Sequence, residues 1–200
     1  MTRLIEVGFI VEGHGDVKAV PVAFRRIVEL QFPGLQTRLR DPFRVPRDKL
    51  KKDGELERTV EFVARGLTGR RVILVLIDSE EDCPAELAPD LLRRATKARS
   101  DLPIGVVLAK HEFENWFIAA AGSVAGQRGL ALDLTCPAEP EAIQGAKEWL
   151  SARMTARPYK ETTDQEPLAR AFDLQMARMS PSFDKMWRGV SRIVSAAIAA

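Results

Sequence analysis

The chain has 200 residues, of which 46% are hydrophobic and 29% are charged, a composition typical of a globular protein with a full apolar core. Its formal net charge of +2 is too close to balance to indicate a nucleic-acid or membrane partner by itself. No apolar run approaches the roughly 20 residues that cross a bilayer. Two cysteines without metal-ligand spacing, and no signal-peptide pattern, lead us to expect a cytoplasmic protein.

The first apolar run, residues 4–11, is rich in β-branched residues and predicts a strand. Apolar residues then recur on one face over residues 17–32, which predicts a helix. Because proline lacks an N–H group, we expect residues 16–20 to form a turn that places Pro21 in the first helical turn.

The next segments are shorter. A short strand is expected at residues 35–40, followed by a basic, proline-containing loop at 44–54. Residues 55–66 predict a helix that ends at a glycine.

The clearest strand is residues 71–77, RVILVLI, whose continuous apolar run indicates burial on both faces. The acidic stretch DSEEDCP and a helix at about residues 85–99 follow it. A third apolar run, residues 102–109, is followed by HEFENWF and another helix. The repeated order of strand, acids and helix predicts an α/β fold with a central, mainly parallel sheet and helices on both faces.

The last third of the chain predicts mainly helix. Ser180 and Pro181 form a good N-cap and first-turn pair before an apolar stripe at helical spacing. We therefore divide the chain into an α/β core, residues 1–135, and a helical C-terminal extension, residues 136–200, packed on that core within a single domain.

Acids follow each of the three predicted strands, as Glu12, Asp78 and Glu114. The carboxyl ends of parallel strands lie along one edge of a sheet, so these side chains should converge. Carboxylates in one cleft repel one another, and hard oxygen donors suit Mg²⁺ or Mn²⁺ as the counter-charge. The other explanation is that each acid caps the helix after it, and Asp16 is a good candidate for that role.

The ordered segments VEGHGD, LIDSEEDCP, HEFENWF, RPYKETTDQ and SPSFDKM resemble a known group of proteins. They are similar to the Toprim fold of topoisomerases, primases and OLD-type nucleases. The resemblance is closer to a bacterial Toprim-like family, domain of unknown function 4276, and covers nearly the whole chain. It implies a three-layer α/β fold with the helical extension described above.

The resemblance also implies roles for particular acids. Glu12 matches the acid of the first Toprim motif, Asp78 and Glu80 match the Asp-x-Asp motif, and Glu114 matches the later acid, which makes these four the candidate catalytic residues. The second acid of the Asp-x-Asp motif is here a glutamate, one methylene longer. Which carboxylate reaches a metal is therefore open.

Neighbouring acids extend the candidate metal ligands, which are Glu12, Asp78, Glu80, Asp82 and Glu112. We do not expect Glu112 and Glu114 to point the same way, because residues two apart on a helix lie on different faces.

Basic residues in the last third are candidates for contact with phosphate or nucleic acid. Lys160 lies beside Tyr159 in a polar loop that the resemblance places near the site. Lys185 and Arg188 share a face of the C-terminal helix, where they could hold a nucleic-acid backbone without reading bases.

Two functions are compatible with these features. The resemblance implies a Mg²⁺- or Mn²⁺-dependent phosphodiester nuclease that works with an ABC- or AAA-type ATPase encoded nearby, as in phage-defence systems. The chain has no Walker A motif and is not expected to be that ATPase. The alternative is a non-catalytic Toprim-like subunit that binds an ATPase, DNA or RNA.

Overall fold

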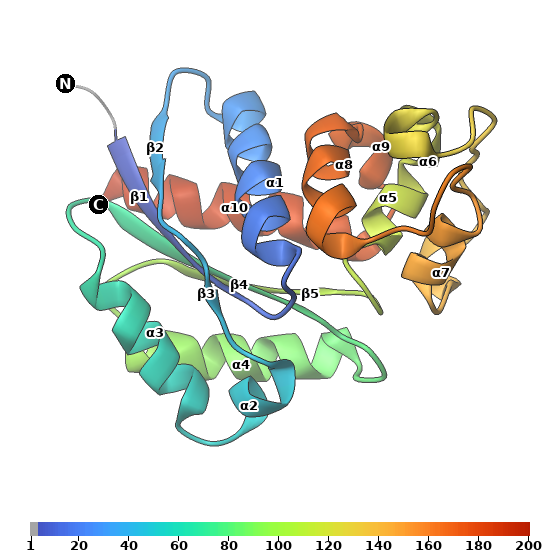
Figure 1. Cartoon of the computed structure of the whole chain (residues 1–200). Helices are drawn as coiled ribbons and strands as arrows, with labels where there is room; N and C mark the ends of the chain where they lie inside the picture. The colour runs from blue at the N-terminus through green and yellow to red at the C-terminus, as the bar shows by residue number, and fades with distance from the viewer. Residues whose placement is uncertain (1–3) are drawn as a thin grey trace.

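Five parallel strands form the central sheet of the computed structural model, which describes residues 4–200 (Figure 1). The order along the sheet is β2, β1, β4, β5, and β3 pairs with the carboxyl end of β1 on the same side as β2. The three long strands predicted from the sequence are therefore neighbours, as expected. The bounds are β1 Leu4–Val11, β2 Gln36–Leu39, β3 Phe43–Arg44, β4 Arg71–Asp78 and β5 Ile104–Ala109.

Helices cover both faces of this sheet, which confirms the predicted α/β architecture (Figure 1). On one face lie α1 (Asp16–Gln31) and α10 (Pro181–Ala199), and on the other lie α3 (Glu55–Arg65) and α4 (Pro84–Ala98). Alternate residues of each strand point to opposite faces, so one strand contributes to two cores. In β4, for example, the core under α1 and α10 receives Val72, Leu74 and Leu76, and the core under α3 and α4 receives Ile73, Val75 and Ile77.

The remaining elements are short. Most of them gather to one side of α1, on the right of Figure 1, and α8 packs against α1. Among the described residues, every helix is too short or too polar to traverse a lipid bilayer. The short helices are α2 Arg47–Lys51, α5 Asn115–Ala119, α6 Ala121–Val124, α7 Ala146–Ser151, α8 Glu166–Ala171 and α9 Leu174–Ala177, with single helical turns at Gln127–Gly129, Pro140–Ala142 and Glu161–Gln165.

Two local predictions were wrong. The helix α1 begins at Asp16, so Pro21 lies one turn further inside it than expected. A proline there removes one helical hydrogen bond, and the burial of Val20, Phe24 and Ile27 against the sheet compensates for it. The basic loop at 44–54 also contains α2, which Leu50 anchors in the core under α3.

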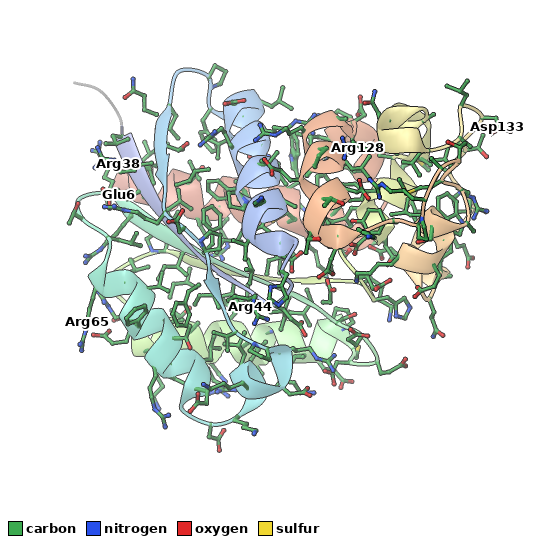
Figure 2. The ribbon with its side chains drawn as sticks, viewed as in Figure 1. Glu6, Arg38, Arg44, Arg65, Arg128 and Asp133 are labelled. Atoms are coloured by element: carbon green, nitrogen blue, oxygen red, sulfur yellow. The ribbon has the colours of Figure 1, made fainter. Side chains whose placement is uncertain are left out.

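Ion pairs of Glu6 join β1 to β2 and to the segment after it. Glu6 is buried at 3% exposure, and its carboxylate accepts hydrogen bonds from Arg38, Arg40 and the backbone N–H of Thr68. Figure 2 shows Glu6 and Arg38 side by side. The edge strand β2 is thereby tied to β1 by side chains as well as by the backbone ladder.

Helix α10 provides a test of this arrangement. Its Ile193 is fully buried and faces Gly105 of β5, so Ile193→Ala leaves a cavity between helix and sheet. We expect the free energy of unfolding to fall by about 2–5 kcal/mol in urea denaturation. Ser195→Ala, at an exposed position of the same helix, serves as the control and should change it by less than about 0.5 kcal/mol. Equal effects of the two substitutions would contradict the packing of α10 on the sheet.

Candidate functional site

Acids from three strands meet at the carboxyl edge of the sheet. Glu12 follows β1, Asp78 ends β4, Glu114 precedes α5, and Asp16 begins α1. We call these four residues the carboxylate cluster. Burial raises the pKa of Asp78 well above its ordinary value, and the nearby negative charges of Asp16, Glu114 and Glu12 raise it further.

Asp16 belongs to this cluster and does not cap α1 as predicted. The N-cap position is Gly15, and no side chain caps the helix. The Asp16 carboxylate turns back to the preceding loop, where Oδ2 accepts from the backbone N–H of Gly13 at 2.9 Å and Oδ1 accepts from Nε2 of Gln165 at 2.8 Å. It is only 3% exposed, and burial raises its pKa.

Two other acids of the cluster are also held by hydrogen bonds. The backbone N–H of Phe113 donates to Oδ1 of Asp78 at 2.9 Å. The hydroxyl of Tyr159 donates to Oε1 of Glu114 at 2.9 Å, in a buried contact. Tyr159 therefore reaches the site, as the family resemblance suggested, and fixes the orientation of the Glu114 carboxylate.

Two buried carboxylate oxygens in the cluster accept no hydrogen bond. They are Oε2 of Glu12 and Oε2 of Glu114, and both atoms are buried. Burial raises the pKa of both side chains, and that of Glu114 reaches about 7. These oxygens are the free acceptor positions of the site.

A lysine that the sequence analysis missed supplies positive charge here. Nζ of Lys147 lies 2.5 Å from Oε1 of Glu112 and 3.4 Å from Oε2 of Glu114. Burial alone would lower the pKa of Lys147, but the negative charges of Glu114, Glu112 and Asp78 outweigh it and raise that pKa far above its usual range. Lys147 is thus a permanent cation beside the cluster.

Glu112 holds this lysine and its helix in place. Its Oε2 accepts from the backbone N–H groups of Ala146 at 2.6 Å and Lys147 at 3.3 Å, where α7 begins. The expectation that Glu112 and Glu114 point apart was wrong, because both contact the same ammonium group. They precede α5 instead of lying within it, so the rule for helical faces does not apply.

The remaining predicted acids lie at the rim. Glu80 is exposed, and its negative charge adds to the effect of burial, which raises the pKa of Glu12. Asp82 pairs with Lys51 at 2.7 Å and with Arg47 at 3.1 Å, and these ion pairs lower its pKa. The side chain of Asp82 is therefore engaged by α2 rather than by the cluster.

Hydrogen bonds join the loop after β4 to the loop after β5. Glu80 and His111 both have positive φ angles, of 50° and 59°. The N–H of Glu80 donates to the carbonyl of His111 at 3.2 Å, and the N–H of His111 donates to Oγ of Ser79 at 3.0 Å. Positive φ is strained for such residues, and these cross-loop bonds stabilise it.

The predicted basic residues lie outside the cluster. Lys160 and Lys185 are exposed, and Arg188 pairs with Asp184 at 2.7 Å on the surface of α10. Within residues 4–200, no hydrogen bond or ion pair joins these three side chains to the carboxylate cluster. An arginine that was not predicted does contact the site, because Arg44 donates to the backbone carbonyl of Glu12 at 3.3 Å.

The cluster is not arranged as a preformed metal cage. Across residues 4–200, no group of three or more His, Cys, Asp or Glu side chains is placed to hold a metal ion. The free positions are instead the two unpaired oxygens of Glu12 and Glu114, one of which faces Lys147.

The raised pKa of Glu114 predicts how stability depends on pH. The folded protein keeps a proton on this group up to about pH 7, whereas the unfolded chain loses it near the ordinary pKa of 4.5. The contribution of this proton to the free energy of unfolding is therefore complete below pH 4.5 and is lost as pH rises through 7. Asp16, Asp78 and Glu12, with raised pKa values, act in the same direction.

We expect the melting temperature of the metal-free protein to fall between about pH 5 and pH 8. In Glu114→Gln the fall should be smaller, because this group no longer titrates. Glu166→Gln, which removes only a surface pair with Arg170, should keep the wild-type slope. A wild-type melting temperature that does not change over this range would contradict the buried, proton-binding cluster.

The model of a family described as a domain of unknown function, DUF4276, matches residues 11–191. The match includes all four acids of the carboxylate cluster together with Lys147 and Tyr159. No curated protein and no solved structure matches the chain. Because the family match covers most of its length, the chain belongs to the DUF4276 family.

Proposed function

We propose that this protein is a Toprim-like, metal-dependent phosphodiester hydrolase, a nuclease, in which the carboxylate cluster binds Mg²⁺ or Mn²⁺. The observation that carries the proposal is the pair of buried, unpaired carboxylate oxygens on Glu12 and Glu114. A buried polar atom without a partner costs on the order of 1–3 kcal/mol, and a bound cation would remove that cost. The site lies where ligands bind in open parallel sheets.

The donor chemistry fits this kind of ion. Carboxylate oxygens are hard ligands, and Mg²⁺ usually takes only one or two of them directly while keeping waters that phosphate oxygens can replace. Glu12 and Glu114 would hold the ion, with Asp78 between their strands and Glu80 at the rim. When bound, the ion supplies an activated water and stabilises charge on the leaving oxygen.

The protein's own contribution is to fix these acids in advance. Tyr159 donates to one oxygen of Glu114 and leaves the other free. The backbone of Phe113 orients Asp78, and Gln165 orients Asp16. Such preorganisation is what a catalytic constellation requires.

Basic residues outside the carboxylate cluster would hold the nucleic-acid backbone. Arg44 is next to the first acid, and we keep Lys160, Lys185 and Arg188 as proposed phosphate contacts. Phosphate contacts of this kind add affinity without sequence preference, so DNA and RNA are both compatible with them.

We also propose that the protein acts in the bacterial cytoplasm with an ABC- or AAA-type ATPase encoded nearby, in a phage-defence role. An exposed aromatic pair supports a protein partner. Phe43 and Phe62 are 40% and 61% exposed, and their ring centroids lie 4.9 Å apart. They line a hollow with Arg40, Arg65 and Leu67. Exposed aromatic residues beside arginine are typical of protein interfaces.

The same surface favours a second candidate function, a non-catalytic Toprim-like subunit that binds an ATPase or nucleic acid. In that case the acids would be structural. The two candidates differ in what a divalent cation does to the protein.

Substitution of Asp78 tests the hydrolase. In Asp78→Asn we expect hydrolysis of a single-stranded oligonucleotide in Mn²⁺ to fall at least about 100-fold, because the ligand set loses a charge. The metal-free variant should melt at the same temperature as the wild type or higher, since the substitution relieves repulsion and the amide oxygen can still accept from Phe113.

The control is Glu81→Gln, an exposed acid of the same loop, which should retain activity. Millimolar Mn²⁺ should raise the wild-type melting temperature, because a ligand that binds only the folded state stabilises it. No hydrolysis together with a melting temperature indifferent to Mn²⁺ would leave the non-catalytic subunit as the function.

Substitution of Phe62 tests the partner surface. When the protein is co-expressed with the neighbouring ATPase, we expect the two to co-elute in size exclusion. Phe62→Ser should weaken this association at least about tenfold, because it removes an exposed aromatic anchor. Leu30→Ser, an equally exposed apolar position on α1, should leave it unchanged. Separate elution of the wild-type proteins at micromolar concentration would refute the partnership.

A further inference from the structure

We propose that Lys147 is a built-in counter-ion of the carboxylate cluster, which a divalent cation must displace before it occupies the site. This inference rests on the proposed metal binding and adds how the empty site is stabilised and how it is loaded. It gives Lys147 a role that the order of acids in the sequence does not reveal.

The ammonium group and a cation would use the same atom. Oε2 of Glu114 is one of the two unpaired buried oxygens of the carboxylate cluster, and Nζ of Lys147 lies 3.4 Å from it. This distance is that of an ion pair, but the oxygen still accepts no hydrogen bond. The lysine neutralises the ionised form of this carboxylate without saturating it, so a cation that binds the oxygen directly meets the positive charge of Lys147.

The Lys147 ammonium group can move away from the carboxylate cluster without unfolding the residues around it. Its side chain is 31% exposed, so the ammonium group has a path to solvent along its flexible four-carbon stem. The helix behind it stays anchored, because the backbone N–H groups of Ala146 and Lys147 bind Glu112 independently of the side chain. Withdrawal of Nζ therefore frees both Glu112 Oε1 and Glu114 Oε2.

The same helix connects Lys147 to the residue that orients Glu114. Oγ of Ser151 donates to the carbonyl of Lys147 at 2.7 Å and accepts from the backbone N–H of Tyr159 at 3.1 Å. Tyr159 then donates to Oε1 of Glu114. One oxygen of Glu114 therefore faces the removable positive charge of Lys147, and the other accepts a fixed hydrogen bond from Tyr159, which α7 holds through Ser151.

Mn²⁺ binding, measured by isothermal titration calorimetry on the full chain, tests the inference. Lys147→Met keeps much of the side-chain volume and removes the charge, and we expect it to bind Mn²⁺ at least about tenfold more tightly than the wild type. Lys147→Arg keeps the charge and should bind no more tightly than the wild type. Lys97→Met removes an exposed charge on α4 and should stay within about twofold of the wild type.

The outcomes separate this inference from the proposed function. If the wild type and Lys147→Met bind Mn²⁺ equally well, or if the variant binds more weakly, the counter-ion role is wrong while metal binding stands. If neither protein binds Mn²⁺, the proposed metal site fails and the inference fails with it.

A measurement on the wild type covers the case in which Lys147→Met does not fold. Reductive methylation followed by mass spectrometry reports which lysines are free of ion pairs. Methylation of Lys147 should be slow without metal and should rise several-fold with saturating Mg²⁺, while that of exposed Lys97 stays constant. Protection of Lys147 that persists in Mg²⁺ would overturn the displacement.

Discussion

Electrostatic repulsion among carboxylates is the constraint on which the rest of this structure depends. A parallel sheet directs the ends of β1, β4 and β5 to one edge, and three of the four cluster acids come from those ends. Burial adds to the repulsion by raising the cost of each negative charge. Three polar side chains from residues 146–165 contact these acids and offset the repulsion, namely Lys147, Tyr159 and Gln165.

These contacts explain why the last third of the chain is more than an appendage. Its short helices add buried residues such as Leu150 and Leu168 to the core under α1 and α10. Residues 146–165 also bring a cation, a hydroxyl and an amide to the acids of the first two thirds. The π-helical turn Glu161–Gln165 places Gln165 over Asp16, and the start of α7 places Lys147 beside Glu114. The site is therefore shared by the two parts of the chain, the predicted α/β core and the C-terminal extension packed on it.

The sheet and its long helices were predictable because each has a strong local signal. The run RVILVLI could only be a buried strand, and the pair Ser180 and Pro181 marked the start of α10 correctly. The convergence of acids also followed from topology, since parallel strands share an edge. Pro21 misled because its local cost was smaller than the gain from packing the rest of α1.

The polar contacts within the site were not predictable in the same way. Nothing in the sequence around Lys147 distinguishes it from a lysine on a solvated helix, and its partner acids lie more than thirty residues away. Asp16 carried a capping signal that its real partners, Gly13 and Gln165, override. Pairing between side chains that are distant in the sequence depends on how the helices and strands pack, and local sequence patterns do not predict it.

The position of α10 has a consequence for how the protein is made. This helix covers one face of β4 and β5, yet it follows every strand in the chain by a long interval. During synthesis the strands therefore leave the ribosome well before their cover does, and the apolar side chains that α10 will bury are exposed in the meantime. A chain whose synthesis stalls before α10 would expose the apolar side chains of β4 and β5 that α10 covers in the finished protein, and it would be prone to chaperone binding or aggregation.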